Sequence, residues 1–310
     1  MFKNLMIYRI APEWEADLGS VEAALEKNRF VPCGPTQQKS SGWVEPRGEA
    51  HAALVESVRG QWLMKLATEQ RVVPTAVVKK RAEEIATHIE QTSGRKPGKR
   101  EMKELKEQAL MELLPVAFTR QSMTRVWINP EARFLLVDAG SASKADEVTT
   151  LLVKAMAGLS LRLVQTALSP AAAMTAWLME GAAPEGFAID RECELKSTDE
   201  MKSVVRYARH LLDIDEVKQH LQHGKVPTRL AMSWQDRIAF TLTDTLVLKK
   251  LAFLEAVMEQ AVDDGVEKGF DGDALIATSE IGHMLPGLLE ALGGESDGLQ
   301  AALQPAAAPV

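Results

Sequence analysis

Residues 224–243 read GKVPTRLAMSWQDRIAFTLT, and this stretch decides the fold class. Its apolar and β-branched residues predict two consecutive strands, over residues 228–234 and 237–243. Successive side chains of a strand point to opposite faces, so Arg229 should face away from the core while Leu230 and Met232 face in. We therefore expect an antiparallel sheet with one face available to solvent.

The same pattern continues on both sides of this stretch. We expect a helix through Trp177, extended segments over residues 187–195 and 203–208, and a helix over residues 214–223. A further strand over residues 246–251 and mostly helix as far as Leu292 complete a second α+β domain, residues 169–298. Residues 299–310 are rich in Ala and Pro, which predicts a disordered tail.

The first part of the chain also mixes strands and helices. Strands are predicted over residues 2–10, 118–129, 133–138 and 161–166, shorter extended segments around 43–44 and 62–68, and helices over 21–27 and 145–158. Residues 1–75 and 115–168 should form one central α+β domain.

Residues 76–114 change to a helical period. Helices over residues 76–91 and 98–114 are separated by a Gly- and Pro-containing turn, which predicts a helical hairpin. Its apolar positions form a narrow stripe, so the hairpin should project and pack on one side only. These positions are Ile85, Ile89, Met102, Leu105 and Ala109. The fold class is therefore α+β, with mixed or antiparallel sheets, packed helices and a projecting hairpin.

Charge is unevenly distributed along the chain. The net charge is -7, but residues 251–310 contain eleven Asp and Glu against one Lys, which leaves +3 for residues 1–250. Binding to nucleic acid depends on local Lys and Arg and not on the whole-chain sum. The composition therefore permits DNA binding.

Several other functions find no support in the residues. No apolar run approaches the roughly 18 residues of a membrane span, and the first residues lack the apolar core of a secretion signal, so a cytoplasmic protein is expected. Cys33 and Cys193 are too far apart in sequence to suggest a disulfide framework or a zinc site. His220 and His223 could share a helix face, but no second pair of metal ligands lies nearby in the sequence. Residues 94–100 resemble a nucleotide-binding loop, but they are one residue shorter than the motif and have Arg100 where the motif has the hydroxyl of Ser or Thr. We expect no cofactor, no metal and no catalysis.

Two groups of basic residues are candidates for phosphate contacts. On the second hairpin helix, Lys99, Lys103 and Lys106 share one face, although interspersed Glu residues are equally typical of a solvated helix. The second domain offers cations on varied elements, which would suit binding to the DNA backbone without reading bases. These are Arg206, Arg209, Lys218, Lys225, Arg229, Lys249 and Lys250.

An ordered set of segments resembles the family of the recombination-associated protein RdgC. The segments are FKNLMIYR (2–9), FVPCG (30–34), SGWVEP (41–46), LLPVAFTR (113–120), MTRVWI (123–128), GKVPTRLAMSWQDRIAF (224–240) and LLEALGGE (288–295). They occur in the family's order and spacing from Phe2 to about Glu295.

The resemblance implies horseshoe-shaped subunits that form a ring-shaped homodimer around double-stranded DNA, with single-stranded DNA as a further ligand. Such a protein would bind DNA without sequence preference, associate with the nucleoid, and restrain RecA in recombination and at replication forks. By position, Lys225, Arg206 and Arg209 would face the DNA, and Arg229, Lys218 and Lys249 would add to the same basic region.

The resemblance also implies a contact between subunits at the end of the hairpin, formed by Phe118 together with Leu114 and Met111. The residues alone favour burial of Phe118 in the core of its own chain over a contact with another chain, and the resemblance reverses this expectation. Gln121 departs from the family, where an aromatic residue is common, so this contact should be more polar here. The stretch 195–205 differs in length, which leaves the register of Arg206 and Arg209 open.

Two other functions remain alternatives. The chain could act on a recombinase directly through its acidic C-terminal helices, without needing DNA. It could also be an enzyme acting on nucleic acid, although the sequence lacks the clustered carboxylates or metal ligands that this chemistry requires.

Overall fold

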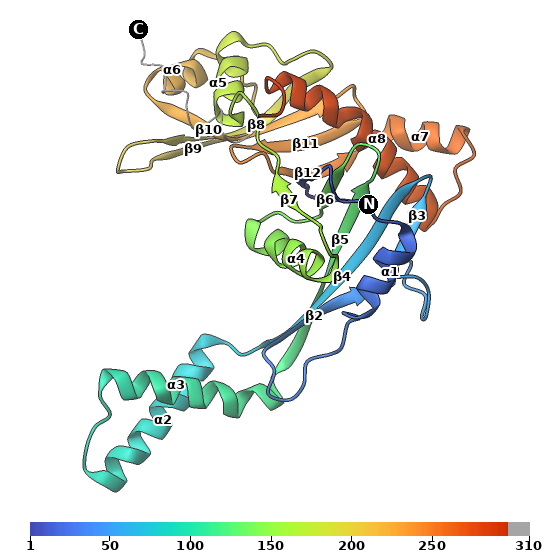
Figure 1. Cartoon of the computed structure of the whole chain (residues 1–310). Helices are drawn as coiled ribbons and strands as arrows, with labels where there is room; N and C mark the ends of the chain where they lie inside the picture. The colour runs from blue at the N-terminus through green and yellow to red at the C-terminus, as the bar shows by residue number, and fades with distance from the viewer. Residues whose placement is uncertain (297–310) are drawn as a thin grey trace. The chain divides into compact units, whose positions relative to one another are not determined.

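The computed structural model describes residues 1–296, and these residues form two compact units (Figure 1). Unit 1 contains Met1–Glu22, Val55–Leu63 and the chain from Arg125 onwards, and unit 2 contains Ala23–Leu54 and Met64–Thr124. The mixture of antiparallel sheets and helices confirms the α+β class. The domain boundaries expected from the sequence stay a prediction, and the expected disordered tail at 299–310 lies outside the described residues.

A five-stranded antiparallel sheet dominates unit 1. Its strand order is β12 (Leu248–Phe253), β11 (Ile238–Thr243), β10 (Lys225–Trp234), β8 (Phe187–Ser197) and β9 (Val204–Ala208). Each of these strands was expected from the sequence, with ends shifted by a few residues. Leu230 pairs with Leu242 and Met232 with Phe240, and all four are buried, so the predicted alternation is confirmed.

Helices cover one face of this sheet (Figure 1). They are α5 (Pro170–Glu180), α6 (Asp215–Gln222) and α8 (Phe270–Ala291), while α7 (Glu255–Asp263) precedes α8. Ser169 begins α5 because its hydroxyl accepts a hydrogen bond from the amide of Ala172, and Gly181 ends it in the left-handed conformation. The buried side chains of α5 and α8, including Trp177 and Met284, pack against the inner face of the sheet.

The other strands of unit 1 belong to a second sheet. β1 (Met6–Ile10) lies between β6 (Phe134–Val137) and β7 (Leu161–Leu163), and β6 also pairs with the end of β5 (Phe118–Asn129). Leu5 and Leu248 exchange two backbone hydrogen bonds of 2.8 and 3.0 Å, which tie the start of the chain to β12. Helix α4 (Ala142–Ala155) was expected from the sequence; the short β3 (Val55–Val58) was not.

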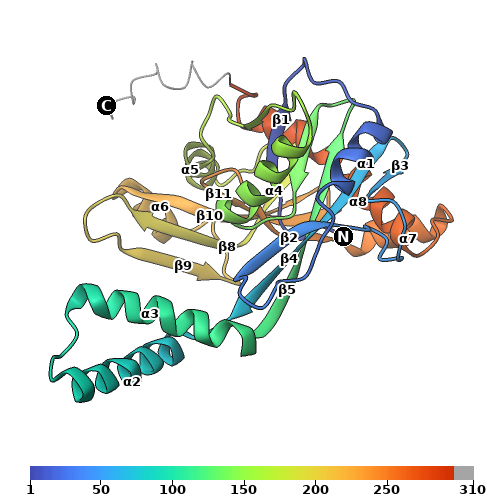
Figure 2. The same cartoon turned by 60° about the horizontal axis from the view of Figure 1, so that its bottom comes forward.

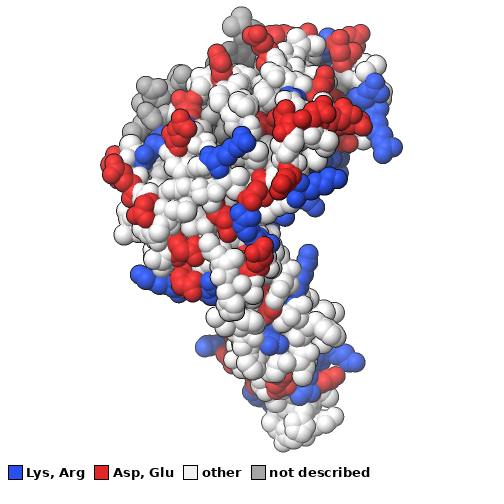
Figure 3. Space-filling view, turned by 90° about the vertical axis from the view of Figure 1, so that its right-hand side faces the viewer, with Lys and Arg blue, Asp and Glu red and all other residues white. Residues whose placement is uncertain are grey.

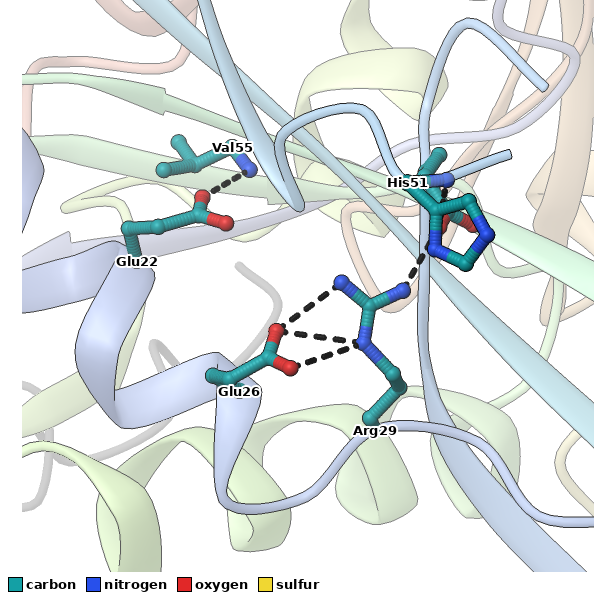
Figure 4. Close-up of polar contacts among 6 residues, drawn as sticks. Glu22, Glu26, Arg29, His51 and Val55 are labelled. Carbon is teal, nitrogen blue, oxygen red and sulfur yellow. Dashed lines mark hydrogen bonds and ion pairs between the residues drawn. The ribbon is translucent and has the colours of Figure 1, made fainter. Parts of the chain in front are cut away.

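Unit 2 is built on β2 (Lys39–Val44) and on parts of β4 (Gln61–Val72) and β5. Gly42 on β2 must lack a side chain, because a Cβ there would lie 2.4 Å from the Cα of Phe30. Arg29 follows α1 (Leu18–Glu26) and binds the carboxylates of Glu26 and Glu45 (Figure 4). These contacts hold the turn after α1 against the neighbouring loop.

The predicted hairpin is present in unit 2 as α2 (Thr75–Ser93) and α3 (Lys99–Leu113), followed by the short helix η1 (Leu114–Val116) (Figure 2). The two helices pack on each other through small side chains, Ala82 and Ala86 from α2 and Ala109 from α3, together with Leu105. Ile85, Ile89 and Met102 are partly buried around them, so the predicted apolar stripe is confirmed. Gly94 closes α2 with φ of 69°.

Candidate nucleic-acid interface

The five-stranded sheet has an inner face that the helices cover and an outer face that carries charge. Cys193 pairs with Leu230, and both are buried on the inner face. The next pair, Glu194 and Arg229, must point the opposite way because side chains alternate along a strand. Glu194 also pairs with Arg206 on β9, so these three side chains share the outer face.

A hollow of about 290 Å3 lies on this outer face. Four cations from three strands line it: Arg206 from β9, Arg229 from β10, and Lys249 and Lys250 from β12. Thr241 on β11 and Asn4 also contribute to the lining. We call this surface the outer basic face.

An irregularity in β12 brings its two lysines to the hollow together. Ala252 pairs with Ala239, but Lys249 pairs with Thr241, so β12 contains one extra residue over this interval. Lys250 has φ of 52°, the left-handed conformation that such a bulge can require. Both Lys249 and Lys250 consequently reach the hollow, whereas regular alternation would have sent them to opposite faces.

Two carboxylates of β8 lie among the four cations. The Nε of Arg206 donates a hydrogen bond of 2.6 Å to Glu194, and the Nζ of Lys250 lies 2.7 Å from Glu192. The guanidinium of Arg206 holds the pKa of Glu194 below its usual range, and the hydroxyl of Thr228 adds to this effect. The lining of the hollow thus contains four cations and two carboxylates. The outer basic face therefore keeps a positive excess.

The other cations expected in this region do not line the hollow. Lys225 begins β10 and pairs with Ser197 on β8. Ser197 points to the same face of the sheet as the buried Leu195, two residues earlier, so Lys225 lies at the end of the sheet on the helix-covered face. Arg209 follows β9 and is exposed, with φ of 57°. Lys218 lies on α6 and donates a hydrogen bond of 2.8 Å to Asp213. The structure thus brings Arg206, Arg229 and Lys249 together and leaves these three apart.

The hairpin cations Lys99 and Lys103 are exposed on α3, in unit 2. Their neighbours form ion pairs within the hairpin, such as Arg95 with Glu101 and Arg100 with Glu104. Figure 3 shows blue and red side chains intermixed over the lower part of the molecule, where the hairpin lies in Figure 1. The surface of the hairpin is therefore nearly balanced in charge.

The three apolar residues expected at a subunit contact differ in exposure. Phe118 is 89% exposed and Met111 59%, whereas Leu114 is 1% exposed and belongs to the interior of its own chain. Val116, which the sequence did not single out, lies between Met111 and Phe118 along the chain and is 79% exposed. We call Met111, Val116 and Phe118 the apolar patch.

Unit 2 also contains a polar network that the sequence did not reveal. Glu69 is buried and accepts hydrogen bonds from the amide of Cys33 (2.8 Å) and from the side chain of Gln121 (2.7 Å). The guanidinium of Arg71 donates to the carbonyl oxygens of Gly34 and Leu114, both at 3.1 Å. This network anchors the chain that leads from the hairpin into β5.

The part of the chain that the structure describes shows neither a metal cluster nor a membrane-spanning helix. No group of three or more His, Cys, Asp or Glu side chains within residues 1–296 could hold a metal ion. Among the helices of the same residues, none is long and apolar enough to cross a membrane.

Comparison with known proteins identifies the class of protein. Residues 1–295 match the family model described as "Putative exonuclease, RdgC". The chain is 44% identical to the recombination-associated protein RdgC of Dechloromonas aromatica and 45% identical to that of Cupriavidus necator. Each match covers 95% of this chain and 98% of the relative. These relatives place the chain in the class of recombination-associated proteins.

Within that class, the chain belongs to the RdgC family, and the resemblance stated from the sequence is confirmed. The two descriptions emphasise different properties, since the family model refers to an exonuclease and the relatives are named for recombination.

Proposed function

We propose that the outer basic face binds the backbone of double-stranded DNA without sequence preference, and that single-stranded DNA can bind in the same way. The observation that carries the proposal is the convergence of Arg206, Arg229, Lys249 and Lys250 around one hollow. These cations stand on strands of one sheet, so their spacing is fixed by backbone pairing. Contacts to phosphates fix a protein on DNA but do not read its sequence.

The chain would act on DNA as a ring-shaped homodimer of horseshoe-shaped subunits. The apolar patch supports this assembly, because exposed apolar clusters of this kind are typical of surfaces that another chain covers. A two-fold axis would bring two such patches together as one self-complementary contact. The ring would encircle duplex DNA at the nucleoid in the cytoplasm, and it would restrain RecA-dependent recombination and fork repair by competing for DNA.

The experiment that tests DNA binding measures affinity for duplex DNA over a range of salt concentrations. The logarithm of the affinity should fall linearly with the logarithm of salt, by about 0.9 per phosphate neutralised. Arg229→Glu and Lys249→Glu should each weaken binding to all sequences alike and make this slope shallower. Lys268→Glu, the same charge change in the segment between α7 and α8, is the matched control.

Equal binding by the two variants and the control would refute the assignment of DNA to this face. A marked preference for one short sequence would refute backbone recognition. The proposal includes no catalytic activity. Magnesium-dependent degradation of DNA that co-purifies with the protein would overturn this absence of catalysis.

A second candidate function is direct action on the recombinase. Helix α7 favours it, because Met258 and Val262 are exposed one helical turn apart beside the acidic Glu255, Glu259 and Asp263. This function would hold if Arg229→Glu abolished DNA binding and left inhibition of the recombinase unchanged.

A further inference from the structure

Glu194 lies in the middle of the outer basic face and is held there from two sides. One carboxylate oxygen, Oε1, accepts a hydrogen bond of 2.8 Å from the hydroxyl of Thr228. The other, Oε2, lies 2.6 Å from the Nε of Arg206 and 3.9 Å from the Nη1 of Arg229. The side chain of Glu194 is only 13% exposed, whereas those of both arginines are more than half exposed.

This arrangement contributes little to stability, since ion pairs with a well-exposed partner are weak. Its larger effect is electrostatic, because one fixed carboxylate offsets one of the two positive charges of Arg206 and Arg229. A carboxylate and a phosphate also use the same guanidinium donors, with similar hydrogen-bond lengths. Glu194 therefore occupies donors that a DNA phosphate would need.

We propose that Glu194 is an internal competitor of the DNA phosphate and limits how tightly the outer basic face holds DNA. The inference rests on the proposed function of this face. Thr228 anchors the carboxylate on the sheet, so Glu194 stays in place while Arg206, exposed on the edge strand β9, turns from the carboxylate to the phosphate. Each binding event must break the contact between Arg206 and Glu194, and each release restores it.

The competition has a kinetic consequence. Because Glu194 can re-form its ion pair with Arg206, it shortens the lifetime of each contact between Arg206 and a phosphate. The protein should therefore exchange rapidly between positions on DNA. Glu194 is thus a residue that regulates affinity, and it does not itself contact the ligand.

Glu194→Gln tests the proposal because it keeps the shape of the side chain and removes its charge. We expect about tenfold tighter binding to a random duplex at low salt, slower dissociation, and a salt dependence steeper by about 0.9. Glu180→Gln makes the same charge change on α5, which packs on the opposite face of the sheet, and should leave all three quantities unchanged. Glu194→Ala repeats the test if Gln disturbs the strand.

A double-mutant cycle sharpens the test. Arg206→Ala should weaken DNA binding only slightly in the native chain, where the arginine is already neutralised, and several-fold more in combination with Glu194→Gln. Equal or weaker binding by Glu194→Gln, or the same loss from Arg206→Ala in both backgrounds, would overturn the proposal. Failure of the proposed function gives a different result, since Arg229→Glu and Lys249→Glu would then also leave DNA binding unchanged.

Discussion

The guanidinium of Arg71 donates a hydrogen bond of 3.1 Å to the carbonyl oxygen of Leu114, at the end of the hairpin. The same group also donates to the carbonyl oxygens of Cys33, Gly34 and Ala117. One side chain of β4 therefore joins the loop before β2 to the chain that presents the apolar patch.

Replacing Arg71 by Ala should lower the free energy of unfolding by about 2–3 kcal/mol, because several partly buried carbonyl groups lose their donor. Arg71→Lys should recover little, since an ammonium group cannot reproduce the planar fork. Urea denaturation measures both. Arg100→Ala, at an exposed ion pair on α3, serves as the control and should change the free energy of unfolding by less than about 1 kcal/mol.

The hydrogen bond from Gln121 to Glu69 should make the stability of the protein depend on pH. The side chain of Gln121, followed by the amide of Cys33, holds the pKa of Glu69 below its usual range. A carboxyl group with a depressed pKa in the folded state adds stability above its ordinary pKa, and this stability is lost as the pH falls through the depressed value. Gln121→Ala should therefore reduce the difference in Tm between pH 7 and pH 3.

The control for this experiment is Gln91→Ala, at the exposed end of α2. It should leave the pH dependence of Tm as in the native chain. Parallel pH profiles for Gln121→Ala and the native chain would show that Gln121 does not set the pKa of Glu69.

Substitutions of Phe118 and Leu114 should affect two different properties, the association of subunits and the folding stability of one subunit. Phe118→Ala should leave the stability of the isolated subunit nearly unchanged, because its side chain is exposed. If the proposed dimer forms through the apolar patch, the substitution should weaken it and ease loading onto closed circular DNA. Leu114→Ala should instead cost about 2–5 kcal/mol of folding free energy, because it opens a cavity. Analytical ultracentrifugation and thermal unfolding measure the two effects. An unaltered dimer in Phe118→Ala would remove the apolar patch from the proposed interface.

Gly42 should tolerate no side chain. A Cβ at this position would meet the backbone of Phe30 at 2.4–2.6 Å, so Gly42→Ala should destabilise the protein by about 3 kcal/mol. Gly282 lies within α8 with open space around its Cα, and Gly282→Ala should stabilise the helix by about 0.5–1 kcal/mol. Opposite shifts in Tm would confirm both assignments.

The elements of the fold were largely predictable because their periodicity is local. The strand 118–129 and the hairpin helices follow directly from apolar spacing and from the Gly- and Pro-containing turn between the helices. β3 was missed because four residues, Val55–Val58, are too few to establish a period. The residues alone favoured burial of Phe118, because its neighbours in sequence fit a core strand, and its exposure in the structure differs from that expectation.

The site was predictable only as a set of basic residues. Which cations meet depends on strand register, and the bulge at Lys250 changes the register in a way that alternation alone does not show. The same limit applies to Lys225, whose place opposite Ser197 puts it outside the hollow. Glu194 was not found because its importance comes from cross-strand neighbours that are 12 and 35 residues away in sequence.

The pairing of Leu5 with Leu248 has a consequence for biosynthesis. Leu5 leaves the ribosome early, but its backbone partner Leu248 is made almost 250 residues later. Every segment of unit 2, in contrast, has been synthesised by Thr124. Unit 2 can therefore fold during translation, and β1 can pair with β6 and β7 once those strands are made. The backbone groups of Leu5 must wait for β12, and chaperones that protect nascent chains would act on this N-terminal segment.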